Sequence, residues 1–178
     1  MMRIYLPITF GALCLTSDAS AQATDPAPWL AMAEVCEEVV WSNSEAPLAG
    51  FAPAAPIVDT MGLEEIAVRH PTALVAAGAF TPGDWFLCVV TGAPPLAAAA
   101  DADAVIAALI AWQRDRLRLA GHVEVNLASN EIGPVRVRCR RDGAAVLVAV
   151  LDVEGDVRLG VTTGLPQSVE NPCLTPSS

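Results

Sequence analysis

Residues 121–164 decide the predicted fold and read GHVEVNLASNEIGPVRVRCRRDGAAVLVAVLDVEGDVRLGVTTG. Over 122–128 and again over 135–141, apolar and polar residues alternate one by one. Alternation with a period of two is typical of strands that bury only one face. The stretch therefore predicts four antiparallel strands in a meander, with the valines of neighbouring strands on one common face.

Glycine-containing turns set the expected register of this meander. Asp142-Gly143, and more weakly Glu154-Gly155, are typical of two-residue hairpins, because both central positions of such a turn need a positive φ. Counting outward from these turns and from a longer loop over 129–134 predicts the following cross-strand pairs: Glu124 with Arg138, Leu127 with Val135, Arg136 with Ala149, Arg138 with Leu147, Arg140 with Ala145, Val148 with Val161 and Val150 with Leu159. A slip of one residue would invert one strand, so the agreement of the valines favours this register.

The face opposite the valines carries three arginines beside small, flat residues. Two interpretations stay open: a solvated face with arginine stems lying over alanines, or a docking surface, since arginine is enriched at interfaces. If the predicted helices cover only the valine face, the other face stays open and half apolar, as contact sites often are. The candidate binding residues on it are Glu124, Arg136, Arg138, Arg140 and Leu147.

Two helices are expected from apolar residues that recur with helical spacing. Residues 29–41 place one stripe on Trp29, Ala33, Cys36 and Val40. The glutamates around this stripe, at 34, 37, 38 and 45, lack the spacing of a calcium loop and predict a solvated acidic face. A second helix is expected from Asp101 or Asp103 to about residue 119, and it should lie on the valine face. Its predicted core stripe consists of Val105, Ile106, Leu109, Ile110 and Leu117.

The remaining segments give weaker signals. Residues 62–68 predict a short helix, and 72–80 fit a strand or a helix equally well. Residues 85–91 predict a strand that is apolar on both faces and therefore covered on both. After residue 164 no further regular element is expected. Together the chain predicts an α+β fold: an antiparallel four- to five-stranded meander sheet with helices packed on one face, stabilised by disulfides.

Composition limits the class of partner. The 178 residues are 53% hydrophobic and carry a formal net charge of −10, and all ten basic residues are arginine. An acidic protein of this kind is repelled by nucleic acid and by anionic membrane surfaces, so neither is expected as a partner. Cationic proteins, metal ions and neutral small molecules remain open.

The N-terminus has the pattern of a secretory signal peptide over residues 1–23. Arg3 precedes a mostly apolar run, and overlapping Ala-x-Ala cleavage sites end at Ala21 and Ala23. We expect a periplasmic or secreted protein with no membrane association after cleavage. The mature chain, residues 24–178, is expected to be a single α+β domain with a C-terminal tail over 165–178.

Four cysteines remain after cleavage, and an even number in an exported chain predicts disulfides. Three pairings of Cys36, Cys88, Cys139 and Cys173 are possible. Cys36–Cys88 with Cys139–Cys173 is preferred, because Cys36 lies on a helix core stripe and Cys88 in a buried strand. A zinc site would require Cys-x-x-Cys or paired histidines, and neither is present.

No enzyme signature is present in the sequence. His122 is the one plausible general base, and a structural polar role fits it better. The first hypothesis is therefore a non-catalytic exported interaction or ligand-binding module of unknown partner, without cofactor or metal. The alternatives are an acidic inhibitor of a cationic periplasmic hydrolase and a small enzyme with a site near His122 and Glu124.

Overall fold

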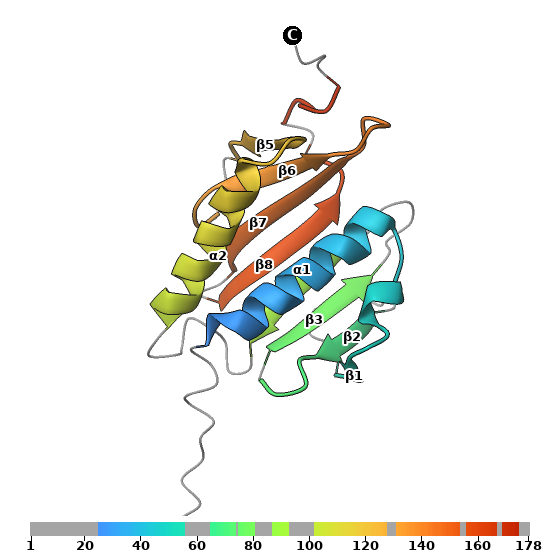
Figure 1. The fold of residues 1–178 in the computed structure, drawn as a ribbon, viewed down its shortest axis with the longest axis vertical. Coiled ribbons are helices and arrows are strands. Elements are labelled where there is room, and N and C mark those ends of the chain that lie inside the picture. Colours follow the sequence, from blue (N-terminus) through green and yellow to red (C-terminus); the bar gives the residue numbers. More distant parts are fainter. Residues whose placement is uncertain are drawn as a thin grey trace, which may run out of the picture.

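An eight-stranded antiparallel sheet with two helices on one face forms the fold (Figure 1). The computed structural model describes residues 25–55, 65–73, 75–80, 87–92, 102–127, 131–153, 156–166 and 169–174. The elements are α1 Pro26–Ser42, the 3-10 helix η1 Ala46–Leu48, β1 Ala52–Pro53, β2 Glu65–Arg69, β3 Val75–Phe80, β4 Leu87–Gly92, α2 Ala102–Leu117, β5 His122–Val125, β6 Val135–Cys139, β7 Ala145–Val153 and β8 Asp156–Thr163. The α+β class is confirmed, but the sheet has eight strands rather than four or five.

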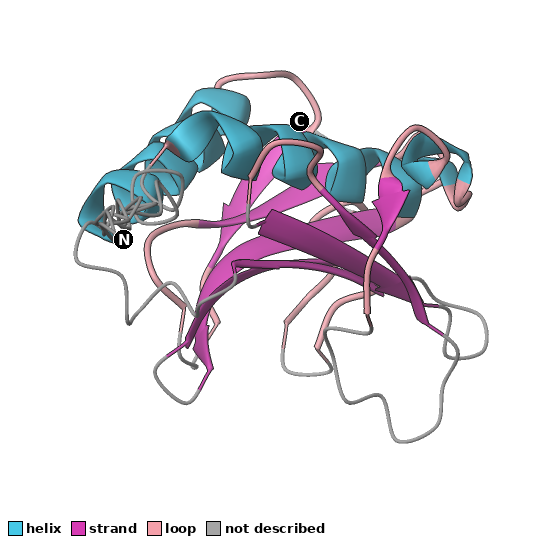
Figure 2. Cartoon of the chain, turned by 90° about the horizontal axis from the view of Figure 1, so that it is seen from below, coloured by secondary structure: helices cyan, strands magenta, loops and turns pink. Residues whose placement is uncertain are grey.

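The strand order β1-β2-β3-β4-β8-β7-β6-β5 divides the sheet into two similar halves. Each half consists of a helix followed by four strands in a meander, first α1 with β1–β4 and then α2 with β5–β8. The last strands of the two halves, β4 and β8, pair antiparallel at the centre. Both helices lie on the same face of the curved sheet that results (Figure 2).

The predicted signal peptide over residues 1–23 lies outside the described residues. In the parts of the chain that are described, neither helix has the length and apolar character needed to cross a membrane.

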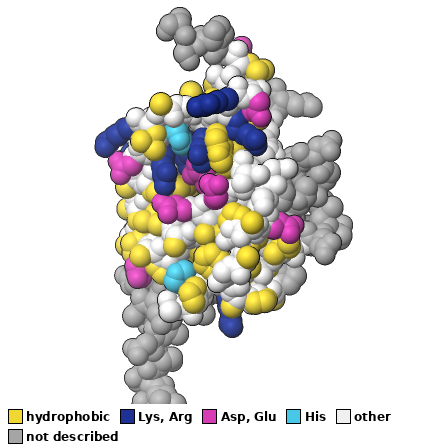
Figure 3. Space-filling model, turned by 45° about the vertical axis from the view of Figure 1, so that its right-hand side comes forward, with side chains coloured by type: hydrophobic (Ala, Val, Ile, Leu, Met, Phe, Trp, Pro, Cys, Tyr) yellow, Lys and Arg dark blue, Asp and Glu magenta, His cyan; other side chains and the backbone are white. Residues whose placement is uncertain are grey.

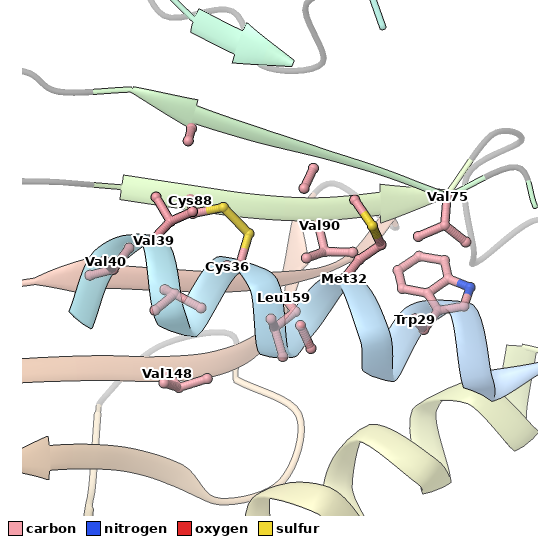
Figure 4. Close-up of a cluster of buried hydrophobic side chains, with 14 of the residues drawn as sticks. Trp29, Met32, Cys36, Val39, Val40, Val75, Cys88, Val90, Val148 and Leu159 are labelled. Carbon is pink, nitrogen blue, oxygen red and sulfur yellow. A yellow bond between two sulfur atoms is a disulfide. The ribbon is translucent and has the colours of Figure 1, made fainter. Parts of the chain in front are cut away.

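Helix α1 forms as its sequence predicts. The Oδ1 atom of Asp25 accepts a hydrogen bond from the backbone N–H of Ala27 at 3.0 Å, which caps the helix N-terminus. The expected stripe is buried and packs on β3, β4 and β8. Figure 4 shows Trp29 of this stripe, and Met32 which is buried next to it, beside Val75 and Val90.

A disulfide between Cys36 and Cys88 ties α1 to the centre of the sheet (Figure 4). A second disulfide joins Cys139 at the end of β6 to Cys173 in the C-terminal tail. These are the two pairs that the sequence favours.

Two segments of the first half differ from the prediction. The helix expected over 62–68 is wrong within the described residues, where β2 pairs with β3 along Glu65–Arg69. Short apolar runs do not distinguish strand from helix, and here Val68 is buried in the core while Ile66 packs against it, partly buried. Strand β4 is covered less completely than expected, because Cys88 and Val90 are buried whereas Leu87 and Val89 are only half buried.

The register of the second half is confirmed in one hairpin and wrong in the next. Between β7 and β8, Val150 pairs with Leu159 as predicted. Between β6 and β7, Arg138 pairs with Val146 instead of Leu147, which is a slip of one residue.

A turn with one more residue than expected causes this slip. The N–H of Arg140 donates to the carbonyl oxygen of Ala144, and the N–H of Gly143 donates to the carbonyl oxygen of Arg140. Gly143 has a φ of +84°. The loop therefore has three residues and ends in a left-handed glycine, which is the next most common hairpin after the two-residue type.

The slip inverts β6 relative to β7, so the expected common valine face is wrong. Arg136 and Arg138 turn toward the helices, where they share a face with Val146 and Val148 of β7. Strand β5 slips by two residues, with Glu124 opposite Arg136 rather than Arg138, and keeps its orientation relative to β6.

The sheet face away from the helices carries a second apolar cluster. Its buried members are Val135, Val137, Ala145, Leu147 and Ala149, and Leu165 and Cys173 of the tail pack against it. The prediction that Leu147 lies on an open face is therefore wrong, because this residue is only 7% exposed.

Candidate functional site

A polar cluster surrounds Arg136 between the two helices and β6. The side chain of Arg136 is 0% exposed. The Nη1 and Nη2 atoms of Arg136 donate to the two carboxylate oxygens of Glu37 on α1, at 2.9 and 2.5 Å. A buried charge persists in a folded protein only when it is paired and hydrogen-bonded in this way.

Gln113 of α2 completes the hydrogen bonding of the guanidinium. Its Oε1 atom accepts from Nε of Arg136 at 2.8 Å, and its Nε2 atom donates to the carbonyl oxygen of Val148 at 2.8 Å. Gln113 follows Val105 and Leu109 at spacings of four, so it continues the buried stripe of α2 with a polar residue. The cluster therefore links both helices to β6 and β7.

Glu37 stays ionised in this setting. Burial by itself raises the pKa of its carboxyl group, but the hydrogen bonds and charge of Arg136, helped by Arg138 and Arg116, outweigh burial. The net effect is a pKa below the usual value for glutamate. The expectation that Glu37 belongs to a solvated acidic helix face is wrong, because this residue is buried.

His122 at the start of β5 borders the cluster. Its Nδ1 atom lies 2.9 Å from Nη1 of Arg136, and arginine only donates, so Nδ1 accepts. Burial, followed by the charge of Arg136, lowers the pKa of His122 to about 4. The imidazole is therefore neutral near pH 7, and its Nδ1 lone pair is occupied. The low pKa makes the imidazole a weak base, and the occupied lone pair of Nδ1 cannot accept a further proton, so this geometry does not favour His122 as a general base.

Arg138 lies at the surface end of the same cluster. Its guanidinium carbon is 3.6 Å from the centroid of the Trp41 ring, and its Nη1 atom donates to Oε1 of Glu37 at 3.3 Å. The side chain nevertheless remains 28% exposed. Arg140 lies farther from the ring and donates from Nη1 to the carbonyl oxygen of Trp41 at 3.2 Å.

A groove of about 250 Å³ opens beside Arg138, between α1 and α2. Among the described residues, its lining consists of five charged ones: Glu34, Glu37, Glu38, Arg116 and Arg138. We call this the charged groove. On its rim, Nη2 of Arg116 binds Oε1 of Glu34 at 2.9 Å, in a largely exposed ion pair. Figure 3 shows basic and acidic side chains side by side in the upper part of one face of the molecule.

The structure brings four of the five candidate binding residues to the helix side of the sheet. Glu124 is exposed, Arg136 is buried, and Arg138 and Arg140 are half buried beside Trp41. Leu147 is on the opposite face. The predicted docking surface, with Leu147 beside exposed arginines, is therefore wrong.

Sequence reasoning missed the helix residues that complete the site. Gln113 gave a signal, because it stands four residues after Leu109 on an apolar stripe. Glu37 gave a weaker one, since it directly follows Cys36 of the α1 stripe. Trp41 and Arg116 gave no signal that separates them from other residues near a helix end.

No group of three or more His, Cys, Asp or Glu side chains in the described part of the chain is arranged to hold a metal ion. Comparisons with protein-family models, with curated proteins and with solved structures find no match to this chain. The geometry above therefore carries the functional argument by itself.

Proposed function

We propose that this protein is an exported, non-catalytic binding module and that its partner binds at the charged groove. The observation that carries the proposal is Arg138, whose guanidinium lies on the Trp41 ring and is hydrogen-bonded to the buried Glu37. The position of this side chain is fixed before any partner arrives, so binding would cost little side-chain entropy. Arginine and tryptophan are also the residue types that most often dominate binding interfaces.

Export is part of this proposal. Two disulfides fit an oxidising compartment such as the periplasm or the extracellular space. The leader pattern over residues 1–23 supports the same location, with residues 24–178 as the mature domain.

Affinity capture with the mature chain tests the proposal. Immobilised wild-type protein, the Arg138→Ala variant and the Arg69→Ala variant are each exposed to an extract of exported proteins. Arg69 is the matched control, because it is an exposed arginine on β2, in the other half of the sheet. We expect a partner that the wild type and the Arg69 variant retain equally.

The Arg138→Ala variant should bind that partner at least about tenfold more weakly, or about 1.4 kcal/mol, in a subsequent calorimetric titration. Equal binding by all three proteins would refute the charged groove as the site. If the captured partner is a basic hydrolase that loses its activity when one equivalent of this protein is added, the protein is an inhibitor that binds through the charged groove.

A further inference from the structure

The charged groove contains unused hydrogen-bonding capacity of both signs. Arg138 uses Nη1 for Glu37, and within the described residues its Nε and Nη2 donors have no protein partner. These two atoms form the side edge of the guanidinium, which can bind a carboxylate in bidentate fashion. Glu38 lines the same groove, and its exposed carboxylate likewise has no partner in the described chain.

A ligand of a single charge fits this groove poorly. An anion such as phosphate would meet the carboxylates of Glu34, Glu37 and Glu38, and a metal cation would meet the guanidinium groups of Arg116 and Arg138. Like charges at close range cost free energy and select against such ligands. A ligand with one cationic and one anionic group can place the cation beside a glutamate and the anion beside an arginine.

The size of the groove limits the ligand further. Its volume of about 250 Å³ is below the range of roughly 300–1,000 Å³ that is typical of sites for drug-sized molecules. The lining side chains in the described part of the chain are all charged, so these residues offer no apolar pocket for a large side chain.

We infer that the charged groove binds a small zwitterion, either a free amino acid or a very short peptide through its two free, charged termini. The ligand carboxylate binds Nε and Nη2 of Arg138, and the ligand ammonium group binds Glu38. The buried Arg136–Glu37 pair holds Arg138 in place from below. This inference rests on the proposed function and specifies the chemistry of its ligand.

Calorimetric titration with alanine and with alanyl-alanine is the direct test. N-acetyl-alanyl-alanine, which lacks the ammonium group, and alanyl-alanine amide, which lacks the carboxylate, are the matched probes. We expect saturable binding of at least one zwitterion, with affinity at least about tenfold lower for both blocked forms. Comparison of alanine with alanyl-alanine decides between an amino acid and a peptide.

Variants assign the two charges to residues. Glu38→Gln should weaken binding of the zwitterion and of the amide, which retains its ammonium group, but should not weaken that of the acetylated peptide. Arg138→Gln should weaken binding of the zwitterion and of the acetylated peptide, which retains its carboxylate, but should not weaken that of the amide. Arg69→Gln should bind all of these ligands as the wild type does. Equal affinity for zwitterionic and blocked peptides would overturn the inference, as would the absence of saturable binding. Either result, together with protein capture that depends on Arg138, would leave the proposed function intact, whereas the absence of both zwitterion binding and Arg138-dependent capture would refute the function itself.

Discussion

The two halves of the sheet share one plan but have different interiors. In the first half, α1 packs on β3 and β4 through Trp29, Met32 and Cys36, and a fully buried disulfide crosses the interface. In the second half, the stripe of α2 begins with Val105 and Leu109 but ends on Gln113, against a buried arginine of β6. The interface in the first half is apolar, and we call this half the apolar half. The interface in the second half joins apolar contacts to a hydrogen-bonded ion pair, and we call this half the polar half.

The same arrangement of one helix and four strands is therefore stabilised in one half by apolar packing and in the other half also by a buried ion pair. The interior of the apolar half requires only apolar side chains that fill the space between helix and sheet, so hydrophobic burial stabilises it. The polar half has a buried charge that is stable only while both helices supply its acceptors. It therefore couples the position of α1 and α2 to the orientation of Arg138 at the surface.

The largest expected effect comes from breaking the buried pair in the polar half. Glu37→Ala leaves the guanidinium of Arg136 without its carboxylate and should lower the free energy of unfolding by about 3–5 kcal/mol. Glu38→Ala, one residue along the same helix but exposed, should change it by no more than about 0.5 kcal/mol. Urea denaturation of both variants measures the difference. Similar small changes in the two variants would contradict the buried cluster.

The two disulfides should differ in their response to reduction. Cys36 and Cys88 are 0% exposed, whereas Cys139 and Cys173 are half buried. A mild dithiol should therefore reduce Cys139–Cys173 first and lower the free energy of unfolding by about 3–4 kcal/mol through the added freedom of the unfolded chain. Alkylation followed by peptide mass spectrometry identifies the thiols. Simultaneous labelling of all four cysteines would show that the first interface is no better protected than the second.

Acid should destabilise the polar half selectively. The folded pKa of His122, about 4, lies below the ordinary 6.5. Between these values the unfolded chain binds a proton that the folded chain excludes, so stability falls as pH drops from 6.5 to 4. The lowered pKa of Glu37 adds a further loss below about pH 4.5.

Replacement of the histidine separates these two contributions. His122→Asn should flatten the loss of stability between pH 6.5 and 4 and retain the loss at lower pH. Thermal unfolding measured across this range provides the profile. An identical profile for the variant and the wild type would mean that folding does not lower the pKa of His122.

The smallest expected effect concerns the turn that orients β6. Gly143→Ala places a Cβ atom at a φ of +84° and 2.8 Å from Cδ2 of Leu174, and it should cost about 1 kcal/mol. Gly50→Ala is the control, because Gly50 has no positive φ and nothing within 4 Å of its added Cβ. Equal stabilities of the two variants would argue against the left-handed glycine.

The apolar half and the central hairpin follow from sequence for local reasons. The stripe of α1 repeats at helical spacing, and the β7–β8 pairing follows from a two-residue link between Val153 and Asp156. The helix expected over 62–68 failed because the five residues of β2 are too few to define a period.

The polar half could not be predicted in the same way, for two physical reasons. Asp-Gly is compatible with a two-residue turn and with a three-residue loop, and the one-residue difference inverts β6. The sequence predicts outward-facing arginines because their acceptors are remote along the chain. Glu37 is 99 positions from Arg136 and Gln113 is 23 positions away. Only the folded chain shows that the acceptors needed to bury Arg136 are present.

The orientation of β6 is the central claim, because the buried cluster and the charged groove both depend on it. Nuclear Overhauser contacts between the backbone protons of β6 and β7 measure it directly in solution. We expect contacts that pair Arg138 with Val146 and Arg136 with Val148. Contacts that pair Arg138 with Leu147 and Arg136 with Ala149 would turn the arginines away from the helices and contradict the account.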